Sequence, residues 1–391
     1  MKYVVLLGDG MADRPISALQ GRTPMQAAST PNMDMLARQG RSGLARTVPD
    51  GFPPGSDVAN LSVMGYLPQK YYTGRAPLEA AAMGVRLGQV DIAFRCNFVS
   101  VEGGIMSDYS AGHITSEEGS DLIDALKPLM PEQRLYAGVS YRNLLVLKAG
   151  AKAVCTPPHD ISDQVIDGHL PSGPDADLLI ELMQAAKPVL AKHPVNLKRI
   201  AEGKKPANMI WLWGQGPRPA MPTFQELYGL KGAMISAVDL LRGIGKYAGL
   251  EVVEVPGATG NIDTNYEGKV EAALSALNTL DFVYLHVEAP DEAGHEGKMD
   301  EKIRAIELFD ERVVGPVIEG LCRRGDDWRV LLLPDHATPI AIKTHSREPV
   351  PFAMMGKGIE PDGAGAFNED EAKRGGFGLV EATKLIGMMA R

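Results

Sequence analysis

Residues 2–10 of the chain read KYVVLLGDG, a run of apolar and β-branched residues that ends in Gly-Asp-Gly. A short apolar run bounded by turn residues predicts a buried β-strand. Three later segments have the same form: DFVYLHV (residues 281–287), RVLLL (329–333) and PFAMM (351–355). Each is followed within three residues by Pro or Gly, so we expect four buried strands.

Helical patterns lie between these strands. PNMDMLARQ (residues 31–39) stops at Gly40, and residues 299–321 carry apolar side chains at three- and four-residue steps. Strands that alternate with helices predict an α/β fold, with a mainly parallel sheet covered by helices on both faces.

The middle of the chain has a different character. Residues 86–224 are rich in Pro and Gly and carry strand patterns of their own at 93–101, 143–148 and 209–213. We therefore expect a second, smaller α/β domain, residues 86–224, inserted into the first. The core domain is then discontinuous, residues 1–85 and 225–391.

The composition narrows the class of protein. Hydrophobic residues make up 45% and charged residues 23% of 391, as in ordinary soluble globular proteins. The three cysteines form no CxxC pair, which argues against a disulfide framework or a thiolate zinc site. The first apolar run is too short for a signal peptide, and no stretch is long enough for a membrane span. We expect a cytoplasmic protein with no membrane partner.

The net charge of −9 provides no electrostatic footprint for nucleic acid. Phosphate compounds then have to bind through local cations or metal ions. The sequence leaves the oligomeric state open.

Acidic residues and histidines follow three of the predicted strands. Asp9 follows the first, Asp291 and His295 the second, and Asp335 and His336 the third. Ligands bind outside the carboxyl ends of strands in open α/β sheets. In PDEAGH (residues 290–295) the Asp and the His are four residues apart, so one helical turn would point both at one place.

His345 follows His336 by nine residues and completes a set of three carboxylates and three imidazoles. These ligands suit Zn²⁺ or Mn²⁺, and the lack of thiolates favours an open catalytic site over a closed structural one. Taken alone, an Asp after a strand is usually a turn or cap residue, and a lone His is usually structural. The joint placement at strand ends is what favours a metal site. His286, inside a strand, is interpreted as a buried structural residue.

Ser56 is the nucleophile candidate. It follows the Pro- and Gly-rich stretch GFPPG (residues 51–55) and precedes a helical pattern over residues 57–64. We expect it at the N-cap, where the helix dipole favours an anionic ligand. The alternative is that it merely caps the helix. A serine hydroxyl is a weak nucleophile unless a base or a metal ion activates it, so a serine beside a metal site forms a coherent pair.

The combination of motifs resembles the alkaline phosphatase superfamily, and more closely the archaeal type of cofactor-independent phosphoglycerate mutase. The motifs run in the family's order along nearly the whole chain: LGDGMADR (7–14), TPNMD (30–34), GSDVAN (55–60), YTGRAPLEA (72–80), PDEAGH (290–295), PDHATP (334–339) and THSREPVP (344–351). The resemblance implies an alkaline-phosphatase-like three-layer core with an inserted substrate-binding and phosphotransfer domain.

The resemblance also implies roles for the candidate residues. Two divalent ions (Mn²⁺ or Zn²⁺, with Co²⁺ possible) would be bound, one by Asp291, His295 and His345, the other by Asp9, Asp335, His336 and the oxygen of Ser56. Ser56 would take the phosphoryl group from 3-phosphoglycerate as a phosphoserine and return it to the 2-hydroxyl, with no added 2,3-bisphosphoglycerate. The implied substrate contacts are His113, Arg142, Asp160, Arg218 and Lys231, with Arg75 and Lys269 as further phosphate contacts.

Other functions stay open at this point. A bacterial subset that resembles the mutases in all these motifs has been proposed to phosphorylate homoserine, although no Walker or kinase glycine-rich loop is present. A metal-dependent phosphatase is a second alternative, and a sugar-phosphate-binding module without catalysis is a third. The complete ligand set argues against the third.

Overall fold

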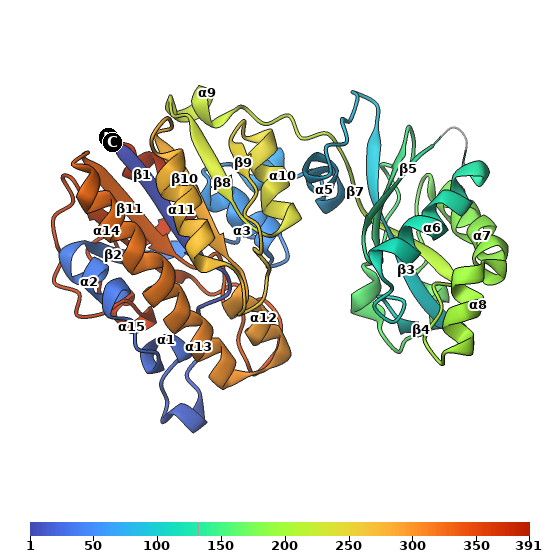
Figure 1. Cartoon of the computed structure of the whole chain (residues 1–391), viewed down its shortest axis with the longest axis horizontal. Helices are drawn as coiled ribbons and strands as arrows, with labels where there is room; N and C mark the ends of the chain where they lie inside the picture. The colour runs from blue at the N-terminus through green and yellow to red at the C-terminus, as the bar shows by residue number, and fades with distance from the viewer. Residues whose placement is uncertain (131–132) are drawn as a thin grey trace. The chain divides into compact units, whose positions relative to one another are not determined.

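The computed structural model describes residues 1–130 and 133–391. The chain divides into two compact units, which we call the core unit (residues 1–72 and 221–391) and the inserted unit (residues 73–220) (Figure 1).

The core unit contains an eight-stranded sheet in the order β13-β2-β12-β11-β1-β10-β8-β9. Its strands are β1 (Lys2–Gly8), β2 (Arg41–Arg46), β8 (Gly232–Ile235), β9 (Glu251–Val253), β10 (Phe282–Val287), β11 (Trp328–Leu333), β12 (Val350–Gly356) and β13 (Leu379–Glu381). β12 pairs antiparallel with both β11 and β2, and the other pairs are parallel. The mainly parallel sheet is confirmed.

β1 lies at the centre of this sheet, between β10 and β11. Figure 1 shows this blue N-terminal strand between strands from the last third of the chain. Residues 3–8 are all buried, as expected for a parallel strand that is covered on both faces. Its apolar run is therefore continuous rather than alternating.

Two groups of helices pack on the sheet. In the first, α2 (Pro31–Gln39) and α11 (Tyr266–Ala276) contact the succession of α13 (Met299–Phe309), the π-helical turn η5 (Asp310–Val314) and α14 (Gly315–Arg324). In the second, α3 (Ser56–Val63) contacts α10 (Asp239–Tyr247) and the 3-10 turn η6 (Ala382–Lys384), which leads into α16 (Leu385–Met389). Shorter helices are α1 (Pro24–Ala27), α4 (Pro68–Tyr71), α9 (Phe224–Tyr228), α12 (Ala289–Glu296) and α15 (Glu369–Lys373).

The predicted helix 299–321 is present but is widened by the π turn at 310–314. The turn directs the buried Asp310 carboxylate at the start of α2, where Oδ1 accepts from Met33 N at 2.6 Å and Oδ2 from Asn32 Nδ2 at 2.9 Å. A π turn thus supplies a cap that periodicity does not reveal.

The inserted unit has its own antiparallel sheet. Its strands are β3 (Ile92–Glu102), β4 (Ile105–Asp108), β5 (Arg134–Val139), β6 (Arg142–Leu147) and β7 (Met209–Pro217), with β3 pairing to β4, β6 and β7. Helices α6 (Ser116–Leu126), α7 (Ala176–Lys192) and α8 (Pro194–Ala201) complete it. Within the described ranges, no helix is both long and apolar enough to cross a membrane.

The inserted unit starts at Thr73, earlier than the expected residue 86. The reason is helix α5 (Arg75–Ala82), which packs on β3 and β7 and buries Ala76 and Ala80. The expected boundary was based on Pro- and Gly-rich composition. Helix α5 lacks that composition, so the sequence did not assign it to the inserted unit.

The role of the Asp310 cap can be measured. Asp310→Ala leaves buried backbone N–H groups of α2 without their acceptor, so we expect a loss of about 1–3 kcal/mol in the stability of the core unit. The measurement is the urea midpoint followed by near-ultraviolet circular dichroism. Glu311→Ala, an exposed neighbour in the same π turn, is the matched control and should leave the midpoint unchanged. Equal midpoints for the two variants would refute the capping role.

Candidate functional site

The three central parallel strands deliver the candidate ligands to one edge of the core sheet. Asp9 follows β1, Asp291 lies in the first turn of α12 after β10, and Asp335 follows β11 by one intervening residue. The register pairs Gly8 with Val287 and Leu7 with Leu333, so the three strands end at the same level.

Gly10 lets two of these segments approach closely. It has φ +61°, and a Cβ placed on it would lie 2.5 Å from Asp291 Oδ1. The second glycine of Gly-Asp-Gly is therefore needed for both its conformation and its lack of a side chain.

Asp291, His295 and His345 form the first ligand group. His295 Nε2 lies 3.2 Å from Asp291 Oδ2 and 2.9 Å from His345 Nε2, and His345 Nε2 lies 3.7 Å from Asp291 Oδ1. The four-residue spacing in α12 points Asp291 and His295 at one place, as predicted. His295 Nδ1 lies 3.1 Å from the carbonyl of Lys343 and donates to it, which orients the ring so that Nε2 faces the group.

The second group surrounds His336. Its Nε2 lies 3.4 Å from Asp9 Oδ1, 3.4 Å from Asp335 Oδ2 and 3.1 Å from Ser56 Oγ. Ligand atoms of Asp9, Asp291 and His336 also lie within 4.8 Å of one another, so Asp291 faces both groups.

The tautomer of His336 follows from Thr338. The single hydroxyl proton of Thr338 is donated to the carboxylate of Asp291, so its oxygen accepts from His336 Nδ1–H at 3.2 Å. His336 Nε2 then carries the lone pair that faces Ser56 and the carboxylates. Burial lowers the pKa of His336, which also favours this neutral form.

The electrostatics of the site call for a cation. Burial raises the pKa of Asp9 well above its ordinary value, and the charges of Asp335 and Asp291 raise it further. Asp9 Oδ1 is also a buried oxygen without a hydrogen-bond partner. A divalent ion would satisfy this oxygen and offset the repulsion among the carboxylates. Oxygen and imidazole donors without thiolates fit Mn²⁺ or Zn²⁺.

The first group has the opposite character. Burial alone would raise the pKa of Asp291, but hydrogen bonds from His295 and His345 lower it well below its ordinary value. Burial alone would lower the pKa of His295, but the hydrogen bond and charge of Asp291 raise it to about 9. The Asp291 carboxylate therefore accepts hydrogen bonds from both imidazoles and holds them close together.

Ser56 is the first residue of α3 and not its N-cap, which corrects the expectation from sequence. Gly55 is the N-cap, with φ 174° and ψ 157°, and its carbonyl accepts from Ala59 N at 3.0 Å. The Ser56 side chain, one position inside the helix, lies 3.1 Å from His336 Nε2. Capping therefore does not account for this serine.

Several residues around the site were missed by sequence reasoning. His286, interpreted as merely buried, lies with Nε2 2.8 Å from Asp9 Oδ2 and with Nδ1 3.1 Å from Ser236 Oγ. Asn60 and Tyr284 extend a hydrogen-bond chain behind Asp335. A weak signal was present, because Asn60 is one helical turn after Ser56 and Tyr284 is two residues before His286 on the same strand.

Lys302 of α13 connects the loop after Asp9 to the loop after His336. Its fully buried amine donates to the carbonyls of Ala12 (3.2 Å) and Thr338 (2.8 Å) and to Asp13 Oδ2 (2.8 Å). All three N–H groups of the ammonium are used, so a buried charge is tolerated here.

The expected substrate residues of the inserted unit lie in several places. His113 has φ 49° in the turn after β4, Asp160 is exposed in a 3-10 turn, Arg142 opens β6 and Arg218 follows β7. Arg142 pairs opposite Asn97 of β3 and Pro217 opposite Ile92. These positions put the Arg142 and Arg218 backbones roughly 20 Å apart along β3, so sheet register alone does not bring them together.

Lys231 is not brought to the site. It immediately precedes β8 and its carbonyl accepts from the backbone at the start of β10, which is the amino-terminal edge of the sheet. The candidate metal ligands lie at the opposite edge. Lys269 is fully buried, with Nζ donating to the His286 carbonyl at 3.0 Å, and Arg75 pairs with Glu79 at 3.1 Å in the inserted unit.

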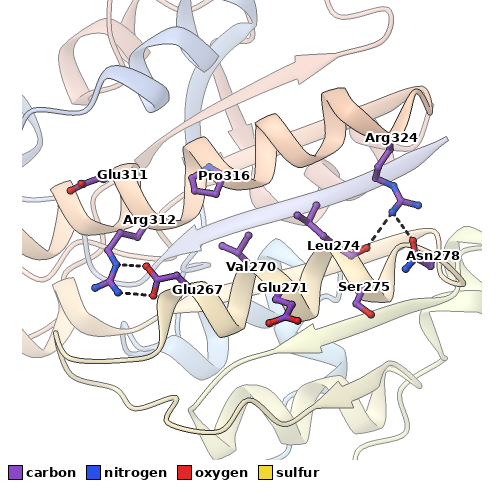
Figure 2. Close-up of a pocket in the computed structure, with 10 residues that line it drawn as sticks. All are labelled: Glu267, Val270, Glu271, Leu274, Ser275, Asn278, Glu311, Arg312, Pro316 and Arg324. Atoms are coloured by element: carbon purple, nitrogen blue, oxygen red, sulfur yellow. Dashed lines mark hydrogen bonds and ion pairs between the residues drawn. The ribbon is translucent and has the colours of Figure 1, made fainter.

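A groove of about 730 Å³ lies elsewhere on the core unit, between α11 and the η5–α14 segment (Figure 2). The bidentate ion pair of Arg312 with Glu267 closes one end, and Arg324 donates to Asn278 Oδ1 at the other. None of its lining residues belongs to either ligand group, so the chemistry is assigned to the strand ends.

Known proteins are similar to this chain in both sequence and fold. Residues 37–196 match the family model of 2,3-bisphosphoglycerate-independent phosphoglycerate mutase. A protein of that name from Methanothrix thermoacetophila is 65% identical, covering 100% of this chain and 99% of the relative, and one from Methanosarcina acetivorans is 57% identical, covering 100% of both. The solved cofactor-independent phosphoglycerate mutase of Thermoplasma acidophilum is 28% identical with a TM-score of 0.67, covering 100% of this chain and 99% of that one. With 65% identity over its whole length, the chain belongs to the family of 2,3-bisphosphoglycerate-independent phosphoglycerate mutases.

Proposed function

We propose that this enzyme interconverts 3-phosphoglycerate and 2-phosphoglycerate through a phosphoserine at Ser56, with two divalent metal ions bound. The observation that carries the proposal is the position of Ser56 Oγ, 3.1 Å from His336 Nε2, which itself lies 3.4 Å from the buried carboxylates of Asp9 and Asp335. A serine that does not cap its helix and faces such a cluster is placed for nucleophilic attack.

Two residue sets would hold the ions. Asp291, His295 and His345 would hold one, and Asp9, Asp335, His336 and Ser56 Oγ the other. When bound, the ions would lower the pKa of the serine hydroxyl and neutralise charge on the transferring phosphoryl group. These Asp, His and Ser donors can bind Mn²⁺, Zn²⁺ or Co²⁺. Which ion is bound depends on the coordination geometry and on which metal is available in the cell.

The reaction balances without a second phosphorylated compound. In the first half, Ser56 Oγ bonds to phosphorus, the bond from phosphorus to the 3-oxygen breaks, and the serine proton ends on that oxygen. In the second half, the 2-oxygen bonds to phosphorus, the serine leaves, and the proton of the 2-hydroxyl returns to it. The N-terminus of α3 stabilises the negative charge of the phosphoryl group throughout. Because Ser56 itself holds the group, 2,3-bisphosphoglycerate is not required.

The inserted unit would hold the glycerate part of the substrate. Arginine pairs in a bidentate manner with carboxylate and phosphate, which suits Arg142 and Arg218, and His113 and Asp160 can hydrogen-bond hydroxyl groups. Retaining the glycerate until the phosphoryl group returns separates a mutase from a phosphatase. A cytoplasmic location is part of the same proposal, because free cysteines persist in a reducing compartment.

The first prediction from the proposed function concerns activity and metal. Protein stripped by a chelator should be inactive, and Mn²⁺ should restore conversion of 3-phosphoglycerate to 2-phosphoglycerate without added 2,3-bisphosphoglycerate, because the buried carboxylates need a cation to face a phosphate. The conversion is followed by ³¹P nuclear magnetic resonance. No conversion with Mn²⁺, Zn²⁺ or Co²⁺, together with ATP-dependent phosphorylation of homoserine, would replace the mutase proposal with the kinase alternative.

The second prediction concerns the nucleophile. Ser56→Ala should lower kcat by roughly 10⁴-fold or more, as removal of a nucleophile does, while Mn²⁺ still binds through the Asp and His ligands. Turnover and equilibrium dialysis of Mn²⁺ are measured on the same preparation.

Ser62→Ala is the control from the same helix. Ser62 Oγ donates back to the Val58 carbonyl at 3.0 Å, a bond whose loss leaves the helix nearly unaffected, so activity should stay near wild type. A fully active Ser56→Ala enzyme would remove Ser56 from the mechanism.

The third prediction separates the substrate residues. Arg142→Ala and Arg218→Ala should each raise the KM for 3-phosphoglycerate by about 10- to 100-fold, the cost of one charge-assisted hydrogen bond. Lys231→Ala should stay within about twofold of wild type, because Lys231 lies at the opposite edge of the core sheet. A large effect of Lys231→Ala on KM, with none for either arginine, would reverse these assignments.

A further inference from the structure

Asn60 joins the helix that carries Ser56 to the loop that carries Asp335. Asn60 Nδ2 donates to Asp335 Oδ2 at 2.7 Å and to the backbone carbonyl of Ser56 at 2.8 Å, and Asn60 Oδ1 accepts from the Tyr284 hydroxyl at 2.6 Å. Asn60 and Tyr284 are both fully buried. The three bonds form a continuous chain from β10, through α3, to the end of β11.

The direction of every bond in this chain is determined. A carboxylate and a peptide carbonyl can only accept, so both N–H groups of the amide must point at Asp335 and Ser56. The amide oxygen then faces Tyr284, whose hydroxyl must donate. The flipped amide would leave two acceptors facing an oxygen, so Asn60 has one orientation in this environment.

Asp335 is held at both oxygens. Oδ1 accepts from Gly10 N at 3.2 Å and from His336 N at 2.9 Å, while Oδ2 receives the bond from Asn60. The two backbone donors belong to the ligand loops themselves. Asn60 is the partner that connects this carboxylate to α3.

Tyr284 gives the chain a rigid base. It lies inside β10, paired with Val5 of β1 on one side and Met234 of β8 on the other. His286, two residues later, points to the same face and holds Asp9. One face of a central strand therefore supports two of the three carboxylates, and sites supported by rigid elements keep their geometry best.

We propose that Asn60 and Tyr284 are positioning residues, which hold Ser56 and Asp335 at a fixed separation for phosphoryl transfer. This inference rests on the proposed function, because it assigns the chain of hydrogen bonds to the alignment of the nucleophile. Neither residue touches the substrate in this role. If the hydrogen bond from Asn60 to Asp335 or that from Tyr284 to Asn60 is lost, the start of α3 can shift relative to β11. A misplacement near 1 Å costs roughly 100-fold in rate.

The test compares two buried tyrosines of the core unit. Tyr284→Phe removes the hydroxyl that fixes Asn60. Tyr266→Phe is the matched control, because Tyr266 is also fully buried and its hydroxyl donates to a single acceptor, the Ile262 carbonyl, at 3.1 Å. Each variant removes one hydroxyl and one hydrogen bond from a fully buried tyrosine, so both lose some thermal stability, and only Tyr284 connects to Ser56.

The deciding readout is the rate at which Ser56 takes the phosphoryl group. Full-length, Mn²⁺-loaded enzyme is mixed with ³²P-labelled 3-phosphoglycerate, quenched with acid, and assayed for labelled serine. Tyr284→Phe should slow labelling and kcat by roughly 10- to 100-fold while KM changes less than about threefold, since the bound substrate is not contacted. Tyr266→Phe should label at the wild-type rate.

Asn60→Asp is the second variant. It keeps the shape of the side chain but sets an acceptor against Asp335 Oδ2, so it should slow labelling at least as much as Tyr284→Phe and weaken Mn²⁺ binding.

The outcomes distinguish this inference from the proposed function. Wild-type enzyme without labelled serine would overturn both. Labelled wild type with Tyr284→Phe indistinguishable from Tyr266→Phe would overturn the positioning role alone, and so would a Tyr284→Phe enzyme whose whole defect lies in KM.

Discussion

Mutual repulsion among three buried carboxylates is the constraint on which the rest of the site depends. Asp9, Asp291 and Asp335 converge because three parallel strands end at one level, and burial makes their charges costly. The protein offsets only part of this cost with its own donors. Asp335 receives three hydrogen bonds and Asp291 those of two histidines, but Asp9 keeps one oxygen without a partner. A site with this residual charge favours a bound cation.

The same constraint explains how closely the surroundings are specified. A carboxylate that faces a cation is kept in place by a hydrogen bond to its other side. Each of the three carboxylates has such a partner: His286 for Asp9, Asn60 for Asp335 and Thr338 for Asp291. The buried amine of Lys302 then connects the loops that carry them. These supports come from strands and helices of the core sheet, so the ligand geometry is set by the fold and not by the loops alone.

Sequence patterns identified the candidate ligands that the fold brings together, but not the residues that support them. Asp9, Asp335 and His336 follow recognisable strands, and the spacing of Asp291 and His295 fits one helical turn, so chemistry and periodicity agreed on them. Tyr284 and Asn60 sit inside apolar runs, where a polar residue gives no sign of its partner until strand pairing is known. Lys231 illustrates a related point, because nearness to a strand in the sequence does not say which end of that strand a residue occupies. The π turn at 310–314 keeps helical periodicity and so escapes detection.

The two ligand groups differ in burial, and the proposed nucleophile Ser56 faces the more buried one. The side chains of His295 and His345 are 32% and 21% exposed, whereas those of His336 and Asp9 are 0% and 1% exposed. Electrostatic interactions are strongest where water is excluded. Ser56 faces the buried group, so the proposed phosphoryl transfer takes place where each charge has its largest effect. Asp291 belongs to the more exposed group, yet its ligand atom also lies within 4.8 Å of those of Asp9 and His336, so this carboxylate connects the two environments.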